Sequence, residues 1–569
     1  MGKSVDTREG ESKTGKSAKS AATQVTAEDL AKKQREISVA EFFEKNRHLL
    51  GFDNPRKALL TAIKEAVDNS LDACEEAKIL PEISVEIIEM SENRYRIIVE
   101  DNGPGIVKEQ IPKIFAKLLY GSKFHRLRQS RGQQGIGISA AVMFSQLTTG
   151  RPTKILSKTG PNKQAHYMEL HLNTQNNSPE IMTDEVRDWD KDRGTRIEMD
   201  LEGSYMKGNQ SVDEYIRQTA IVNPHATFIY TNPKAEQFIY ARATDALPKE
   251  PLEIKPHPYG LELGILVKLL KTTESRTLQS FLVNDLSRVG SGTAKEICDT
   301  ALLDPKRRPG EISMQEAEKL IAAIKNTKIM APTTDCLSPI GDELLEKSLK
   351  KEINAEFYVT ITRPIFVYRG NPFQVEVGLA YGGTQPRDGA VSLLRFANRV
   401  PLLYQQGACA FTKSVVTTNW KAYGLSQSNG ALPVGPLTII IHMVSVWVPF
   451  TSESKEALAH YPEIIKEIKL ALQEAGRKLQ TYVHKKHRVQ NQLERANLFE
   501  RYIPEVADSL SRLTGDNKLV IEQKLKEMIN KEDIKAQIFE MESLKGEGKD
   551  DTSDDSEEDA DESLQEIEE

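Results

Sequence analysis

Cysteine is scarce in this chain: Cys74, Cys298, Cys336 and Cys409 are the only four among 569 residues, and none has a closely spaced partner. That scatter argues against a zinc site or a disulfide framework and favours a reducing cytoplasm. Long hydrophobic runs are also missing, because the most apolar stretch, residues 437–448, carries a His and a Ser and has the β-branched composition of a buried strand. We therefore expect a cytoplasmic protein without a secretory signal and without a membrane partner.

Charge is unevenly distributed along the chain. The net charge is −7, but residues 550–569 hold 12 acids and no base, which leaves +5 for the rest. Such a tail is typical of a disordered, solvating segment, and the alternative is a tail that mimics nucleic acid and competes for the protein's own basic surface. The mildly basic remainder permits contact with nucleic acid.

The amino-terminal residues are rich in Lys, Ser, Thr and Gly, so residues 1–36 are predicted to form a flexible tail. Within this tail, GESKTGKS at residues 10–17 matches the P-loop pattern letter for letter. A P-loop needs a buried strand before it, and the preceding MGKSVDTRE is not one. We therefore do not expect this stretch to bind nucleotide.

The chain length predicts three or four domains, since single cores rarely grow beyond about 300 residues. Helix and strand patterns alternate over 37–253, which predicts an α/β sandwich; the pattern is helical over 254–335, and strands return over 336–498. Apolar residues at alternating spacings of 3 and 4 from Ile465 to Tyr482 predict a long helix. Its seam is a candidate docking edge for a partner, or it packs within its own domain. Residues 499–569 are predicted to be a helical extension followed by the acidic tail.

Three short stretches carry chemistry. In KEAVDNSLDACEEA, residues 64–77, Glu65, Asn69 and Asp72 stand at i, i+4 and i+7 and share one helical face, while the opposite face is apolar enough to lie on a sheet. A solvated face is the ordinary interpretation of such a triplet.

The other two stretches are rich in glycine. In VEDNGPGI a predicted strand ends on Asp101, and Gly103 and Gly105 allow a tight turn close to a flat ligand. In SRGQQGIGISAAV, residues 130–142, three glycines precede a helix, so backbone N–H groups can face an anion there. Each stretch taken alone is more often a turn than a binding site.

Together and in this order, the three stretches resemble the motifs of the GHKL ATPase superfamily, and GTRIEM at residues 194–199 resembles its fourth motif. The resemblance implies ATP and Mg²⁺ as cofactors. Asn69 would coordinate Mg²⁺, Asp101 would bind adenine, and Glu65 would be the general base that activates water. The further nucleotide-binding residues that it implies are Gly103, Gly105, Ser122, Lys123, Gly132, Gln133, Gln134, Gly135, Ile136, Gly137, Ile138, Ser139 and Thr195.

A cation is still needed to neutralise the charge on the transferred phosphoryl group. Lys421 in NWKAYGLSQSNG is the candidate, because its setting resembles the lysine that reaches the terminal phosphate from a second domain in this superfamily. An isolated lysine is otherwise a solvated surface charge. We expect Lys421 to act both in catalysis and in nucleotide binding.

Over residues 37–500 the chain resembles the B subunits of archaeal topoisomerase VI, a type IIB DNA topoisomerase; EFFEKNRHLLGF, FLVNDLSRVG and LLRFANRVPLLYQQGACA are among the matching stretches. The resemblance implies an α+β multidomain fold: a GHKL (Bergerat) α/β sandwich over 37–253, a helix-two-turn-helix domain over 254–335, and a transducer domain over 336–498 with a long C-terminal helix.

The same resemblance implies a function. ATP would close two copies of the chain around a DNA duplex, with the arm at residues 37–52 supporting the self-dimer. Hydrolysis would drive the duplex through a double-strand break, which relaxes supercoils and decatenates DNA. The sequence has no second metal-site pattern suited to DNA cleavage, so the break is assigned to the A subunit of an A2B2 heterotetramer.

The sequence departs from the family pattern in one basic loop, and two alternative functions stay open. A basic KGRR loop of the family is replaced by KGNQSV at residues 207–212, which puts a DNA contact there in doubt; Lys306, Arg307 and Arg308 are alternative contacts or a solvated basic turn. A non-catalytic assembly factor is one alternative function, although Glu65 and Asn69 are intact. A GHKL chaperone or mismatch-repair clamp is the other, and the helical segment at 254–335 weighs against it.

Overall fold

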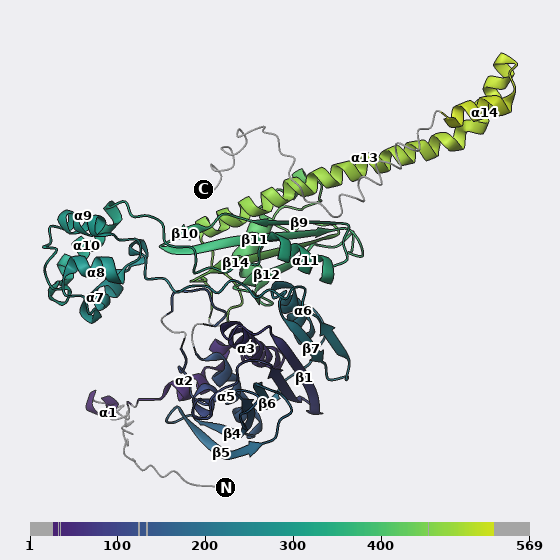
Figure 1. Cartoon of the computed structure of the whole chain (residues 1–569). Coiled ribbons are helices and arrows are strands. Elements are labelled where there is room, and N and C mark those ends of the chain that lie inside the picture. Colours follow the sequence, from purple (N-terminus) through teal and green to yellow (C-terminus); the bar gives the residue numbers. More distant parts are fainter. Residues whose placement is uncertain are drawn as a thin grey trace, which may run out of the picture.

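The structure is a computed structural model, and it describes residues 27–31, 34, 36–122, 126–132, 135–452 and 454–527. Three bodies and a projecting helix make up its shape (Figure 1). The P-loop-like residues 10–17 and the acidic run after residue 550 lie outside the described residues, so the expectations for both tails stay predictions.

An eight-stranded sheet forms the base of the first body, in the order β5-β4-β3-β6-β2-β1-β7-β8. Only β1 and β7 are parallel, and the other pairs are antiparallel. Alternating burial along β2 and β3 reflects one face covered by helices and one face toward water. The strands are β1 (Glu82–Ser91), β2 (Arg94–Asp101), β3 (Thr153–Lys158), β4 (Ala165–Asn173), β5 (Ser178–Arg187), β6 (Gly194–Glu202), β7 (Thr227–Thr231) and β8 (Gln237–Tyr240).

Helix α3 (Pro55–Glu76) crosses this sheet beside α5 (Gly137–Thr149), and the two helices contact each other and β6. It begins after Asn54, whose side chain accepts a hydrogen bond from the Lys57 N–H, and Pro55 at the first position has no N–H and so needs no acceptor. Its apolar face is buried in the core of the domain, as the sequence predicts. The smaller elements around it are α1 (Ala27–Ala31), α2 (Val39–Lys45), η1 (Arg47–Leu50), η2 (Lys108–Gln110), α4 (Ile111–Phe115) and α6 (Val212–Val222).

Residues 258–326 form a separate helical body with its own apolar core. It contains η3 (Pro258–Gly260), α7 (Leu263–Thr272), α8 (Leu278–Asp285), α9 (Ser291–Ala301), η4 (Pro309–Glu311) and α10 (Met314–Asn326). The helical pattern predicted over 254–335 includes α8 and α9. Their break lies at residues 286–290, and α9 begins directly after Gly290.

The third body is built on a six-stranded sheet, β10-β11-β14-β12-β13, with β9 also paired to β11. Its central strand β14 (Leu437–Ser445) is buried along its whole length because both faces are covered. One face is covered by α12 (Ala410–Val416) and α13 (Pro462–Thr514), and the other by α11 (Asp342–Glu352) together with α6 of the first body. The other elements are β9 (Phe357–Thr362), β10 (Phe366–Tyr368), β11 (Asn371–Tyr381), β12 (Ser392–Ala397), β13 (Val400–Pro401), α11 (Asp342–Glu352), η5 (Gln406–Ala408), α12 (Ala410–Val416) and η6 (Trp420–Tyr423).

Helix α13 (Pro462–Thr514) is 53 residues long and projects beyond the third body (Figure 1). The predicted heptad seam is buried in that body's own core, with Ile468, Leu472 and Leu479 packed against the sheet. Of the two predicted alternatives, the structure shows the seam as an internal packing surface and not as a docking edge. The helix runs without interruption through residue 498, where a boundary is predicted, and ends shortly before α14 (Lys518–Glu527).

Candidate nucleotide-binding site

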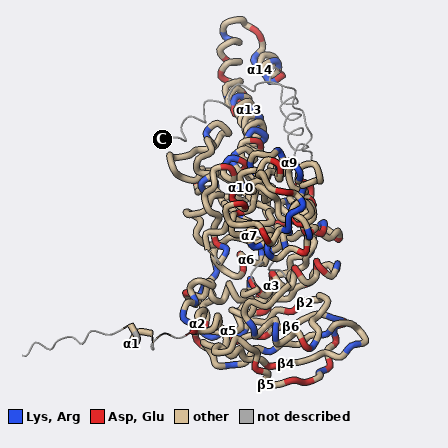
Figure 2. Tube along the Cα trace, turned by 90° about the vertical axis from the view of Figure 1, so that its left-hand side faces the viewer, with Lys and Arg blue, Asp and Glu red and all other residues tan. Residues whose placement is uncertain are grey.

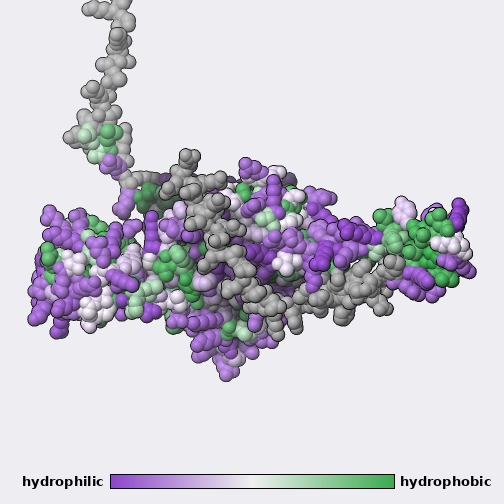
Figure 3. Space-filling view, turned by 90° about the horizontal axis from the view of Figure 1, so that it is seen from above, coloured by the Kyte–Doolittle hydropathy of each residue, from purple (hydrophilic) through white to green (hydrophobic). Residues whose placement is uncertain are grey.

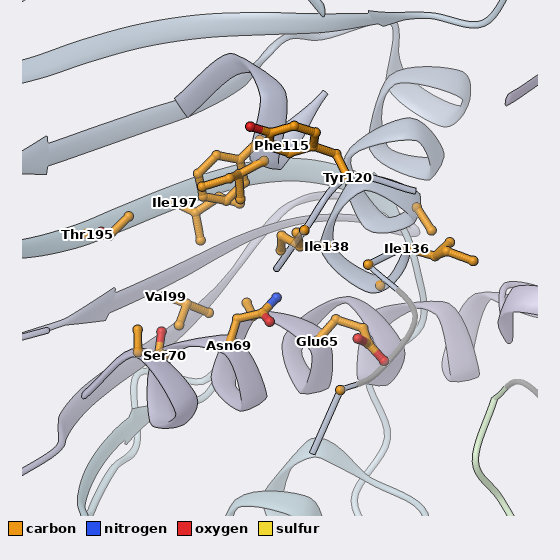
Figure 4. Close-up of a pocket in the computed structure, with 18 of the residues that line it drawn as sticks. Glu65, Asn69, Ser70, Val99, Phe115, Tyr120, Ile136, Ile138, Thr195 and Ile197 are labelled. Atoms are coloured by element: carbon orange, nitrogen blue, oxygen red, sulfur yellow. The ribbon is translucent and has the colours of Figure 1, made fainter. Parts of the chain in front are cut away.

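A cavity of about 550 Å³ lies between α3, the ends of β2 and β6, and the start of α5 (Figure 4). Side chains on α3 form its floor, and Phe115, Tyr120 and Ile197 stand across from them. A mixture of apolar walls and a few convergent polar groups is typical of a site for a small organic ligand.

The polar face of α3 divides between two environments. Glu65 and Asn69 line the cavity and point into it (Figure 4). Asp72 shares their face but lies two turns further along, where it is buried under Arg131 and accepts a hydrogen bond of 2.7 Å from its guanidinium. Asp72 therefore shares the helical face predicted from its spacing but does not line the cavity.

Asp101 is held at the end of β2 by three donors. Its Oδ1 accepts from the backbone N–H of Gly103 at 2.9 Å and of Thr195 at 3.2 Å, and its Oδ2 accepts from the Ser70 hydroxyl at 2.7 Å. Burial raises the pKa of the Asp101 carboxyl, although these hydrogen bonds act in the opposite direction. Ser70 is not among the residues that the sequence motifs single out, because nothing in its spacing marks it as a partner of Asp101.

At two positions other groups come so close to the backbone that only glycine fits. Gly105 has φ +71°, and a Cβ there would lie 2.1 Å from the carbonyl oxygen of Lys158. Gly137, the first residue of α5, has no room for a Cβ because it would lie 1.7 Å from Oε2 of Glu65. The carboxylate of Glu65 therefore sits directly at the amino-terminal end of α5, beside the backbone groups that favour anions.

The glycine segment contributes Gly132, Gly135, Ile136, Gly137 and Ile138 to the cavity wall. Ser139 is buried and donates to the Ile136 carbonyl at 3.0 Å, so its side chain supports the turn. The remaining predicted residues with described positions, namely Gly105, Ser122 and Thr195, also line the cavity, whereas Gly103 only contacts Asp101. Lys123, Gln133 and Gln134 lie outside the described residues.

The predicted cation, Lys421, does not line the cavity. It is exposed on η6, which packs against α13. A different lysine of the third body, Lys455, lines the cavity together with Ser454. Of these two lysines of the third body, Lys455 lines the cavity and Lys421 does not.

Lys455 belongs to the loop between β14 and α13, which reaches across to the nucleotide side. It has φ +53°, a left-handed conformation that a non-glycine residue adopts rarely and that is often found at functional sites. The next residue, Glu456, pairs with Lys57 of α3 and accepts from Gln405 at 2.6 Å, which fixes the loop to both bodies. No spacing in the sequence reveals this contact, because the loop and the cavity are joined only in the folded chain.

The donor set fits a magnesium-bound nucleotide. Among the residues that the structure describes, no group of three or more His, Cys, Asp or Glu could hold a metal ion by itself. Mg²⁺ commonly takes one or two protein oxygens and completes its shell with phosphates and water. The Asn69 amide oxygen at the cavity floor is a suitable single ligand of that kind.

Comparison with known proteins agrees with this geometry. Residues 54–202 match the family model described as histidine kinase-, DNA gyrase B-, and HSP90-like ATPase, and residues 332–495 match the model described as topoisomerase VI B subunit, transducer. The B subunit of type 2 DNA topoisomerase 6 from Methanococcoides burtonii is 54% identical over 486 residues, which cover 85% of this chain and 78% of that protein.

The chain belongs to the topoisomerase VI B-subunit family. Other B subunits in the family include that of Archaeoglobus fulgidus, 49% identical over 86% of this chain and 81% of its own length, and that of Pyrococcus horikoshii, 38% identical over 92% and 99%. The predicted family, the GHKL and transducer fold and the assignment as the B subunit of a topoisomerase are confirmed.

Two further features of this B subunit concern the expectations from composition. In the portion of the chain that the structure describes, no helix combines the length and apolar character needed to cross a membrane. All four cysteines are buried and unlinked. Burial raises the pKa of the Cys298 and Cys336 thiols to about 11.

Proposed function

We propose that the cavity binds ATP with Mg²⁺ and that the chain hydrolyses it. The observation that carries the proposal is the convergence of Glu65, Asn69, Asp101 and Lys455 from two bodies on one cavity. Asp101, fixed by three donors, would accept a hydrogen bond from the exocyclic amine of adenine. The glycine segment and the start of α5 would hold the phosphates.

The proposed chemistry divides among three side chains. Bound Mg²⁺ would supply charge neutralisation at the phosphates, with Asn69 as its protein ligand. Glu65 would accept the proton of the attacking water, a role that typically raises the reaction rate by ~10²–10⁴-fold. Lys455, one residue from the ion pair between Glu456 and Lys57, would place a positive charge beside the terminal phosphate and link hydrolysis to the transducer.

A self-dimer would form on ATP binding through the amino-terminal arm. Residues 37–52 include apolar side chains that are more than a third exposed, and these are Ile37, Val39, Phe42 and Leu49. Exposed apolar side chains that gather in one segment mark interaction surfaces. The proposed dimer would close around a DNA duplex.

The A subunit would dock on the projecting end of the chain to complete an A2B2 heterotetramer. The last part of α13, together with α14, exposes many apolar side chains, including Leu498, Leu513 (82% exposed) and Leu519 (71% exposed). Figure 3 shows apolar surface there. This region replaces the heptad seam as the docking surface. The A subunit would make the double-strand break through which hydrolysis drives a second duplex.

The residues that contact DNA are proposed from their charge and exposure alone. Along the backbone seen in Figure 2, Lys and Arg are interspersed with Asp and Glu. In the turn at 306–308, Arg307 pairs with Glu316, whereas Lys306 and Arg308 are exposed. We therefore propose Lys306 and Arg308 as the contacts from this turn.

Exchange of Glu65 for Gln tests the catalytic part. The expected result is ATP turnover reduced by ~10²–10⁴-fold, with nucleotide-driven dimerisation retained, measured by phosphate release and by sedimentation with a non-hydrolysable analogue. Glu76→Gln is the matched control, because Glu76 lies on the same helix but is exposed and pairs with Arg128. Unchanged turnover in Glu65→Gln would refute the role of Glu65.

Decatenation with and without a separately expressed A subunit tests the topoisomerase part. We expect activity only when both chains and ATP are present. A non-catalytic assembly factor would support the partner equally well in the Glu65→Gln variant, so equal decatenation by that variant would favour the alternative function.

A further inference from the structure

Arg131 lies immediately before the glycine segment and is 6% exposed. Its Nη1 donates to Asp72 Oδ1 at 2.7 Å and Glu75 Oε2 at 2.8 Å, and its Nη2 donates to Glu75 Oε1 at 2.7 Å and Asn223 Oδ1 at 2.6 Å. One guanidinium thus joins the far end of α3 to the residue that ends α6. Four short, charge-assisted hydrogen bonds in a buried place make a rigid anchor.

The electrostatics of this cluster fit a fixed structure. Burial alone would raise the pKa of the Glu75 carboxyl, but Arg131 and His225 hold that pKa well below its usual range. His225 is itself buried, its ring nitrogen lies 2.7 Å from Glu75 Oε1, and burial lowers its pKa. Removing one member of a buried charge network leaves the others unpaired, so the anchor resists rearrangement.

The backbone beside Arg131 is attached to the transducer. Gln129 exchanges two side-chain hydrogen bonds with the backbone of Ser338, at 2.6 and 3.2 Å, and its N–H donates to the Cys336 carbonyl. Asn398 donates to the Ser130 carbonyl at 3.0 Å, and its amide also exchanges two hydrogen bonds of 2.9 Å with the backbone of Ser445 at the end of β14.

The third connection runs through Lys455. Its Nζ donates to the Arg131 carbonyl oxygen at 2.9 Å. The position of that carbonyl is set by the buried Arg131 side chain on one side and by the Asn398 contact to the preceding residue on the other. The lysine that enters the cavity is therefore held by the residue that begins the glycine segment.

We propose that Arg131 is a positioning residue for Lys455, and that residues 129–131 form a joint between the transducer and the phosphate-binding segment. The joint positions Lys455, and this role is distinct from any direct contact that Lys455 makes with phosphate. When the transducer moves relative to α3, Gln129 and Asn398 transmit the movement to Gly132, whereas Arg131 keeps the joint fixed to the nucleotide domain. The proposal rests on the proposed function of the cavity.

Asn398→Ala is the first test, because it removes one of the three connections between the joint and the transducer and leaves the Arg131 cluster and the cavity lining in place. We expect turnover at saturating ATP to fall at least tenfold while the Kd of a non-hydrolysable analogue changes less than twofold. Amide hydrogen exchange supplies a readout that simple loss of stability would not produce. In the wild-type chain the analogue should slow exchange in residues 336–340 and 398–402, and in Asn398→Ala that slowing should disappear.

Two further variants control the interpretation. Arg131→Lys keeps the charge but removes the fork that holds Glu75 and Asn223 together, so it should reproduce the loss of turnover and of nucleotide-dependent exchange. Arg128→Gln removes a guanidinium from the same segment, where it pairs with the exposed Glu76, and should behave as the wild type.

The outcomes are separable. If the wild-type chain hydrolyses ATP and Asn398→Ala matches it in turnover and exchange, the joint is refuted and the proposed function stands. If the wild-type chain does not bind the analogue, the proposed function and the joint both fail. Should Arg128→Gln lose turnover as strongly as Asn398→Ala, the effect belongs to the whole segment and the positioning role of Arg131 is refuted.

Discussion

Substitution of Gly137 by Ala should separate stability from catalysis in this chain. A Cβ at Gly137 would lie 1.7 Å from Oε2 of Glu65, whereas Cβ atoms essentially never come within 3.0 Å of another group. The nearest atom is the end of a flexible side chain, so the carboxylate can swing away and the backbone can stay in place. Because about 1 Å of misplacement can cost ~10²-fold in rate, we expect a loss of at least that size in kcat.

The stability of the same variant should change little or rise slightly. Alanine favours the helix over glycine by roughly 0.5–1 kcal/mol, which offsets the rotation of the Glu65 side chain. The assay is steady-state phosphate release beside urea unfolding. Gly292→Ala is the matched control, because Gly292 also lies in the first turn of a helix, α9, with no atom within 4 Å of its added Cβ. Normal kcat in a folded Gly137→Ala variant would refute the assignment of Glu65 as the base.

Three other predictions concern stability, pH and DNA. Gly105→Ala should destabilise the chain by about 2–4 kcal/mol, because the left-handed backbone and the Lys158 carbonyl both oppose a Cβ; an unaltered Tm would contradict the tight turn that follows β2. Asp68 is buried, and burial raises its pKa from 3.8 to about 6, so ionisation of Asp68 weakens the fold as pH rises through that interval. The free energy of unfolding of Asp68→Asn should therefore gain on the order of 3 kcal/mol relative to that of the wild type between about pH 4 and pH 7. An equal difference between the two proteins at both pH values would exclude this. Neutralising Lys306 and Arg308 should flatten the dependence of DNA affinity on salt by a slope of about 2, and an unchanged slope in titrations at several salt concentrations would remove the turn as a contact.

The elements of the nucleotide site were predictable because their signals are local. The face of α3 follows from residue spacing, and the glycines before α5 mark a turn into a helix whatever lies around them. Lys455 could not be found in this way, since it enters the cavity from a loop more than 300 residues further along the chain. Lys421 has the more distinctive sequence context, but the fold leaves it exposed on η6.

The heptad seam shows a second limit of local reasoning. Spacings of 3 and 4 report that one face of a helix is buried, and they do not report what buries it. In α13 the answer is the sheet of the same body, because β9 and β11 offer an apolar face directly under residues 464–483. The surface left for a partner is the part of α13 beyond this sheet, where regular spacing gives way to scattered exposed side chains such as Phe499 and Leu513.

The position of Asp72 shows how one helical face can hold both residues of the cavity and a residue of the buried anchor. Asp72 shares the face of Glu65 and Asn69, yet Arg131 donates a hydrogen bond to it and makes this second acid of the face part of a buried anchor. The Glu65 carboxylate and the anchor are therefore fixed to one helix, about two turns apart. Because Arg131 is held to this helix and its carbonyl oxygen accepts from Lys455 Nζ, a movement of the transducer that shifts this contact changes where Lys455 lies relative to Glu65. Hydrolysis should then depend on the orientation of the transducer even in variants whose cavity residues are all intact.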